Sequence, residues 1–154
     1  MNLLEKLEEL NLILPPPPKI GGVYTQVREF GTHLCYVSGC GPNIEGREIF
    51  FGKLGVEYSL QEGQVAAKMA VLNLLAVMQK NLGDLGRVKK IVKLLCFVAS
   101  ENHFYQQPEV ANAASQLLVD VFGEECGLGA RSAIGVNVLP GNIPFEIELM
   151  AELN

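Results

Sequence analysis

The chain contains no tryptophan, only two histidines and no hydrophobic run long enough to cross a membrane. A membrane-spanning helix needs about 20 consecutive apolar residues, so we expect no membrane association. Its 154 residues, of which 49% are hydrophobic, are enough for one domain with a substantial core. The sequence therefore predicts one soluble globular domain over residues 1–154.

Basic residues are also scarce, with 12 lysines and arginines against 17 acidic residues and a net charge of −5. Nucleic-acid binding depends on clustered lysine and arginine, usually interleaved with aromatic residues. The only basic cluster is Arg87 to Lys90, which we interpret as the solvated start of a strand. Nucleic acid is therefore not the expected partner.

The four cysteines, Cys35, Cys40, Cys96 and Cys126, show no CxxC spacing, and the N-terminus lacks the features of a secretory signal. This pattern is typical of reduced thiols in a cytoplasmic protein. The two histidines have no metal-ligand spacing relative to the cysteines or carboxylates. We therefore expect no metal site.

Hydrophobic periodicity divides the chain into alternating strands and helices. A leucine stripe predicts an N-terminal helix over residues 1–12, ended by the proline run, so residues 1–14 form an N-terminal extension. The other predicted elements are strands at 23–30 and 34–38, an irregular segment at 43–58, a capped helix at 59–81, a strand at 88–99 and a helix at 108–122.

The last third of the chain predicts two strands, at 131–138 and 145–149, each with one hydrophobic face and one polar face. We expect them to form an antiparallel hairpin that turns near Gly141. Right-handed crossovers would place both long helices on one side of a mixed sheet. The other face would need covering, and we expect a second copy of the chain to cover it.

Arg131 is the leading candidate for anion binding, because the residues after it on its strand face are small. In a hairpin, Glu146 would lie opposite Asn137, about 20 Å from Arg131 along the strands, so a shared site would need two subunits. Arg131 could instead be ion-paired to a neighbouring glutamate. The loop Ser38 to Gly41 is either a plain turn or a source of backbone N–H groups for a ligand.

Several motifs together resemble the Rid family (RidA/YjgF, also called L-PSP endoribonuclease-like), in its longer branch with an N-terminal helix. The motifs are Ala130-Arg131-Ser132, Glu146-Ile147-Glu148, Val37-Ser38-Gly39, Tyr24, Asn112 and the Leu-Pro-Pro-Pro-Pro run from Leu14 to Pro18. The resemblance implies an α+β, chorismate-mutase-like fold. It also implies a homotrimer with ligand sites between subunits.

The family resemblance further implies an enamine/imine deaminase of the 2-iminobutanoate/2-iminopropanoate type, which hydrolyses 2-imino or enamine acids to 2-keto acids and ammonia without a cofactor. Arg131 would hold the substrate carboxylate and Glu146 would orient or activate water. The other pocket residues would be Tyr24, Ser38, Gly39, Asn112 and Ala133, the last standing where well-known members often have cysteine. The alternatives are a non-catalytic or chaperone-like trimer that binds keto acids, and an endoribonuclease.

Overall fold

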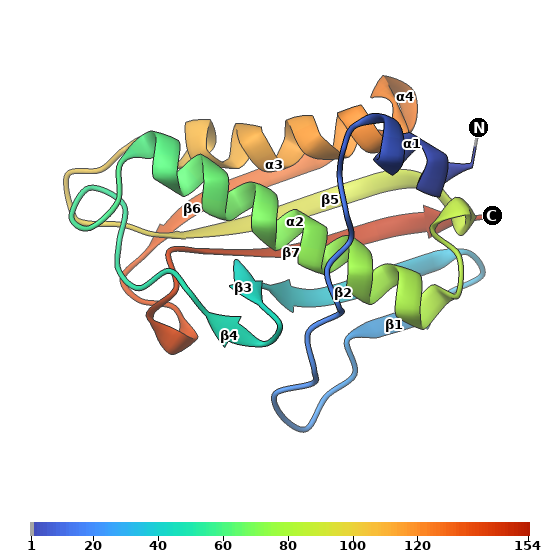
Figure 1. Cartoon of the computed structure of the whole chain (residues 1–154), viewed down its shortest axis with the longest axis horizontal. Helices are drawn as coiled ribbons and strands as arrows, with labels where there is room; N and C mark the ends of the chain where they lie inside the picture. The colour runs from blue at the N-terminus through green and yellow to red at the C-terminus, as the bar shows by residue number, and fades with distance from the viewer. Residues whose placement is uncertain (1) are drawn as a thin grey trace.

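Every second side chain of β7 (Phe145–Leu153) is buried, and the residues between them are partly exposed. This alternation gives the strand one face that packs in the core and one that faces away from it. β5 (Val88–Ala99) shows the same alternation from Lys93 to Val98. The computed structural model, which describes residues 2–154, places these two strands side by side in one sheet (Figure 1).

The main sheet has five strands in the order β1-β2-β7-β5-β6. Its pairs are antiparallel except for β5 and β6, which are parallel. The three remaining strands of this sheet are β1 (Val27–Phe30), β2 (Leu34–Cys40) and β6 (Ala130–Val136). The mixed α+β sheet expected from the sequence is therefore confirmed.

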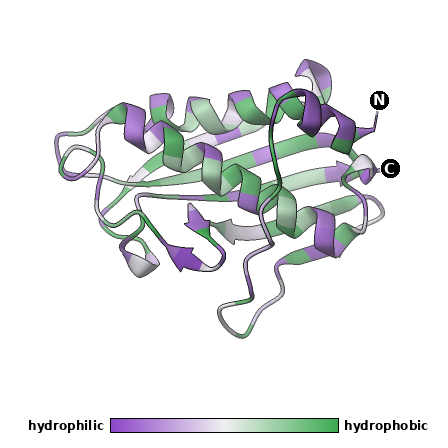
Figure 2. Ribbon diagram, in the orientation of Figure 1, coloured by the Kyte–Doolittle hydropathy of each residue, from purple (hydrophilic) through white to green (hydrophobic). Residues whose placement is uncertain are grey.

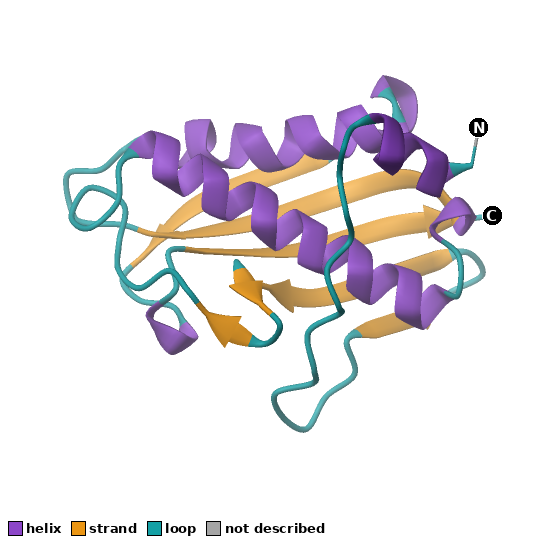
Figure 3. Ribbon diagram, in the orientation of Figure 1, coloured by secondary structure: helices purple, strands orange, loops and turns teal. Residues whose placement is uncertain are grey.

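Two long helices, α2 (Leu60–Leu82) and α3 (Gln107–Phe122), cover one face of the sheet (Figure 3). The predicted capping box begins α2, because the Ser59 side chain accepts from the Glu62 N–H and Glu62 accepts from the Ser59 N–H. Ala66, Ala67 and Ala70 are fully buried on α2, which allows the helix to pack closely. The prediction that both helices lie on one side is confirmed.

The predicted hairpin of the last two strands is wrong. β6 and β7 are not neighbours, because β5 lies between them and pairs with both. The residues of β5 from Leu94 to Val98 are apolar on both faces, and such a strand belongs at the centre of a sheet. The α3 crossover delivers β6 parallel to β5, and the segment containing the 3₁₀ turn Pro140–Asn142 carries the chain back to β7.

The N-terminal helix α1 (Leu3–Glu9) is shorter than predicted, and Met1 lies outside the described residues. Its Leu7 is 3% exposed and joins the hydrophobic core. From α1 the chain runs across α2 to the edge of the sheet near β1 and β2 (Figure 1). We call residues 14–21 of this crossing segment the strap.

The segment 43–58, predicted to be irregular, contains a short hairpin of β3 (Asn43–Ile44) and β4 (Arg47–Glu48). A four-residue helix, α4 (Glu124–Gly127), follows α3. No helix within residues 2–154 has the length and hydrophobicity to cross a membrane.

The sheet face turned away from α2 and α3 carries partly exposed apolar side chains. On β5 these alternate with the buried residues, whereas the corresponding positions of β7 are mostly glutamates. Figure 2 shows the hydropathy of the residues along each strand of the sheet. They include Tyr36, which is 38% exposed, and Ile134, which is 43% exposed. We call this surface the open face.

Candidate functional site

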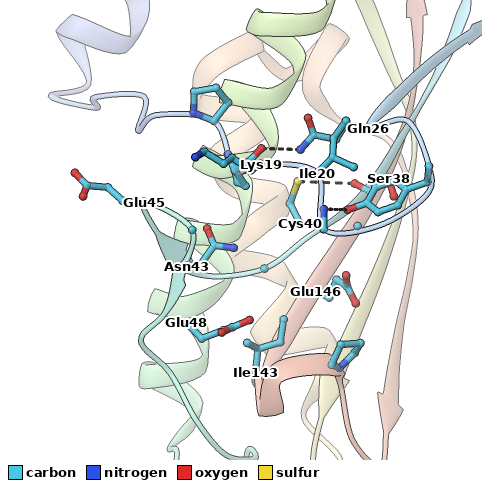
Figure 4. Close-up of a pocket in the computed structure, with 18 of the residues that line it drawn as sticks. Lys19, Ile20, Gln26, Ser38, Cys40, Asn43, Glu45, Glu48, Ile143 and Glu146 are labelled. Atoms are coloured by element: carbon cyan, nitrogen blue, oxygen red, sulfur yellow. Dashed lines mark hydrogen bonds between the residues drawn. The ribbon is translucent and has the colours of Figure 1, made fainter.

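A cavity of about 800 Å³ lies beside the C-terminal end of β2 and the start of β7. Figure 4 shows the strap on one side, the β3-β4 hairpin on another and Glu146 on the sheet side. The lining side chains that matter below are Ile20, Tyr24, Gln26, Ser38, Cys40, Asn43, Glu48, Ile143 and Glu146. We call this the Glu146 cavity.

Gly39 and Glu146 form the floor of this cavity. The pairing of β2 with β7 shifts register between Val37 and Cys40, so the backbone departs from regular pairing at Ser38 and Gly39. A Cβ built at Gly39 would lie only 2.8 Å from the Glu146 carboxyl carbon. Glycine is therefore required here for the carboxylate to lie over the β2 backbone.

The environment of Glu146 favours its neutral form. Burial raises the pKa of this carboxyl above its ordinary value, and the negative charge of Glu148 adds to the effect. Tyr36 donates its O–H to Glu148 Oε2 at 2.6 Å, which helps to fix this neighbouring charge. Within residues 2–154 no side-chain or backbone donor forms a hydrogen bond to the Glu146 carboxylate. Its oxygens are therefore free to bind water or a ligand.

Asn73 on α2 fixes the opposite wall. This residue is 1% exposed, and its Nδ2 donates to the Gly41 carbonyl at 2.9 Å and to the Asn43 carbonyl at 2.7 Å. These bonds hold the link between β2 and the β3-β4 hairpin against the helix. A buried amide on α2 thus positions a wall that lies far from it in sequence.

Two hydrogen bonds connect the strap to residues that lead into β1. Gln26, which is buried, donates from Nε2 to the Pro18 carbonyl at 2.7 Å, and the Gly21 N–H donates to the Tyr24 hydroxyl at 3.3 Å. The dashed line between Gln26 and the strap in Figure 4 marks the first of these bonds. Tyr24 therefore both lines the Glu146 cavity and helps to hold the strap.

Arg131 lies at the other edge of the sheet, in a cavity of about 380 Å³ beside α3. Its Nη1 donates to Asn112 Oδ1 at 2.8 Å and to Ser115 Oγ at 3.1 Å. Asn112 and Ser115 are three residues apart on α3, so they share one helix face. Both partners are neutral.

The ion-pair alternative for Arg131 is not what the structure shows. No carboxylate between residues 2 and 154 lies within 4.0 Å of its guanidinium, whereas Arg87 pairs with Glu29 and Lys89 with Glu152. The positive charge of Arg131 is thus held in place without being neutralised. The remaining donors of such a guanidinium can bond an anion such as a carboxylate.

Arg131 and Glu146 lie on opposite faces of the sheet within one chain. Arg131 pairs with the buried Leu94 and reaches α3, while Glu146 alternates with the buried Phe145 and Ile147 and so points the other way. The register places them three residues apart along the strands and two strands apart across the sheet. These offsets give a separation of about 14 Å, in place of the 20 Å estimated from a hairpin.

The structure thus groups the predicted site residues into two sets. Tyr24, Ser38, Gly39 and Glu146 all line the Glu146 cavity. Asn112 and Arg131 line the second cavity. Ala133 follows two residues after Arg131 on β6, pairs with the buried Cys96 and packs against the core.

Sequence reasoning missed three positioning residues. The sequence could have indicated Ser115, because its spacing from Asn112 places both residues on one face of a predicted helix. Gln26 and Asn73 bond to backbone carbonyls that only the tertiary fold brings near them. No sequence pattern marks such partners.

The thiols near the two cavities are poor nucleophiles. Burial raises the pKa of Cys40 to about 12, with a further contribution from the charge of Glu146. Burial raises the pKa of Cys96 to about 11, partly offset by Arg131 and Lys93. Both therefore remain protonated at neutral pH. In the described part of the chain, no three His, Cys, Asp or Glu side chains gather to hold a metal ion.

Known proteins resemble the chain along nearly all of its length. The family model described as "YjgF/chorismate mutase-like, putative endoribonuclease" matches residues 7–153. Protein TCP17 of Trypanosoma cruzi is 40% identical over 148 residues, which cover 96% of this chain and 92% of TCP17.

Solved structures agree with this assignment. Atu1372 of Agrobacterium tumefaciens, a protein of unknown function, is 35% identical with a TM-score of 0.90, and the match covers 99% of this chain and 92% of that one. A Shewanella oneidensis protein carrying the endoribonuclease label is 29% identical with a TM-score of 0.93, covering 99% and 100%. The chain therefore belongs to the YjgF/chorismate mutase-like family, as its motifs indicated.

Proposed function

We propose that the protein is an enamine/imine deaminase, which hydrolyses 2-imino acids and their enamine tautomers to 2-keto acids and ammonia. The observation that carries this proposal is the uncompensated guanidinium of Arg131, held by two neutral acceptors on α3. Because Nη1 is occupied by Asn112 and Ser115, the Nε and Nη2 donors remain for a two-pronged bond to a substrate carboxylate. That bond would fix the orientation of a small planar acid.

Glu146 is the proposed group for proton transfer. A carboxyl with a raised pKa exchanges protons nearer to neutral pH than an ordinary glutamate does. Water would add to C2 of the protonated imine as the Glu146 carboxylate takes one of its protons, forming a neutral carbinolamine. Glu146 would pass that proton to the nitrogen, and as the C–N bond breaks it would take the hydroxyl proton, leaving the 2-keto acid and ammonia and then releasing the proton to solvent. The reaction needs no nucleophilic side chain or redox step.

The complete site would form between protomers of a homotrimer. Arg131 and Glu146 lie on opposite faces of one sheet, so a second copy of the chain is needed to bring one of each together. The apolar open face, with Tyr36 and Ile134 partly exposed, supplies hydrophobic surface for that association. The two cavities of one chain are thus proposed as halves of two different sites.

The test is to generate 2-imino acids with an amino-acid oxidase and to follow their decay with and without the protein. We expect faster decay with the protein, and a loss of about 100-fold or more in kcat/KM for Arg131→Ala. Arg131→Lys retains the charge without the fork of donors and should recover only a small part of the activity. Decay that the protein does not accelerate, or full activity in Arg131→Ala, would rule out the proposal.

The second candidate is a protein that binds keto acids without turnover, and the same Arg131 receptor would serve it. Thermal stabilisation by 2-oxobutanoate that is lost in Arg131→Ala, without any imine hydrolysis, would select this candidate. The endoribonuclease label finds little support in the composition, because the net charge of −5 disfavours RNA.

A further inference from the structure

We propose that the strap forms a subsite for the substrate side chain, and that the preferred substrates are 2-imino acids with a bulky apolar side chain. This inference rests on the proposed deaminase function and names the substrate class of that site. The strap would then determine substrate specificity without taking part in the chemistry.

The first argument is size. The Glu146 cavity measures about 800 Å³, which falls in the range of roughly 300–1,000 Å³ for pockets that hold drug-sized ligands. The small imino acid derived from alanine would occupy only a small part of this space. A neighbouring protomer that inserts Arg131 would take up some of this volume.

The second argument is the chemistry of the walls. Ile20 and Pro16 to Pro18 of the strap face the cavity from one side, and Ile143 and Pro140 line it on the other. The ring of Tyr24 adds further apolar surface to the lining. Apolar groups gain free energy from leaving water, so these walls favour a hydrocarbon side chain.

The third argument is that the strap is held in position before a ligand binds. The buried Gln26 holds the Pro18 carbonyl, and at the other end Leu7 of α1 is buried in the core. Proline restricts the backbone, so the segment between these anchors is stiff. A preformed wall contributes to binding without the entropic cost of ordering it.

Charged side chains lie at the rim of the same cavity, and they define the main competing substrate class. Lys19, Glu45 and Glu48 are all exposed, and a Cβ at Gly141 would meet the Glu48 carboxylate. If these carboxylates set specificity, an imino acid with a cationic side chain would be preferred. The experiment therefore includes one.

The experiment compares imino acids generated from alanine, leucine, phenylalanine and arginine, with the wild-type protein and two variants. Ile20→Ala removes apolar surface from the strap, and because Ile20 is 52% exposed the fold should tolerate it. Ile13→Ala is the matched control, since Ile13 is 86% exposed on the same N-terminal segment and does not line the cavity.

We expect the leucine and phenylalanine imines to have the highest kcat/KM. Ile20→Ala should lower these two values about tenfold, leave the alanine imine nearly unchanged and differ clearly from Ile13→Ala. Highest activity on the alanine or arginine imine, or equal loss on every substrate in Ile20→Ala, would overturn the inference while leaving the deaminase proposal intact. Hydrolysis of none of the four would overturn both.

Discussion

At the scale of single residues, Arg131 and Glu146 each keep a charge-bearing group without a bonded counter-charge. Arg131 is held by two neutral acceptors, and Glu146 lies over Gly39 with the charge of Glu148 close by. Both arrangements leave bonding capacity for a ligand. Ordinary surface pairs in the same chain, such as Arg87 with Glu29, are instead bonded to each other. This contrast distinguishes Arg131 and Glu146 from the ordinary ion pairs of the surface.

The raised pKa of Glu146 predicts a pH-dependent effect of Glu146→Gln on stability. Because folding raises this pKa, the native state binds more protons than the unfolded state above the ordinary value of 4.5, and stability falls as pH rises through the folded-state pKa. Glu146→Gln removes this cost. We expect the variant to be more stable than wild type at pH 7, with a difference that shrinks as the pH falls below 4.5, while imine hydrolysis is lost.

Denaturant unfolding at both pH values measures the effect. Glu125→Gln, which changes an exposed glutamate of α4 outside both cavities, serves as the activity control and should hydrolyse imines like wild type. A Glu146→Gln protein that is less stable than wild type at pH 7, or that retains full activity, would contradict the assignment of Glu146 as a buried, proton-exchanging carboxyl.

At the scale of elements, α3 holds the Arg131 side chain, the proposed anion receptor. The helix is fixed in the core by residues such as Val110, Leu118 and Val121, and its opposite edge presents Asn112 and Ser115 to Arg131. The edge strand β6 therefore depends on α3 for the placement of its functional side chain. The strap lines the Glu146 cavity in a comparable way.

Ser115→Ala tests the support given by α3. Loss of one hydrogen bond to a charged group costs about 1.5 kcal/mol, so we expect KM to rise about tenfold with a smaller change in kcat. Ser115→Thr retains the hydroxyl and should restore KM toward the wild-type value. A purely structural role would lower the melting temperature of Ser115→Ala and leave KM unchanged, which would refute the positioning role.

At the scale of the whole molecule, the sheet is covered by helices on one face only. The open face carries Tyr36, Phe97 and Ile134 as partly exposed apolar groups, together with Lys93, whose Nζ donates to Ser132 Oγ at 2.7 Å. A surface of this kind is typical of association between copies. The proposed trimer would bury it and complete the site in the same step.

Ile134→Glu tests the proposed trimer. A charge on the open face should prevent association, because burying an unpaired carboxylate in an interface is unfavourable. We expect light scattering to show monomers with an intact fold by circular dichroism and no imine hydrolysis. Val65→Glu, on the exposed side of α2, is the matched control and should remain associated and active. Wild-type protein that is itself monomeric and active would contradict the proposal.

The sequence by itself determined the long secondary-structure elements and the family. Capping at Ser59, Pro108 in the first turn of α3 and the alternation along β7 are local signals, and the structure confirms each of them. The motifs around Arg131 and Glu146 likewise identified the family to which the chain belongs. These features depend only on neighbours in sequence.

Tertiary structure alone decided which strands are adjacent and which groups hold the site together. Alternation assigns a face to each residue of β6 and β7, but it does not say which strand lies beside them. A β6-β7 hairpin and the observed order with β5 between them fit the same local pattern, so the sequence could not distinguish the two. Gln26 and Asn73 find their partners only when distant segments fold together. Long-range pairing depends on the packing of the whole sheet, and no local pattern records it.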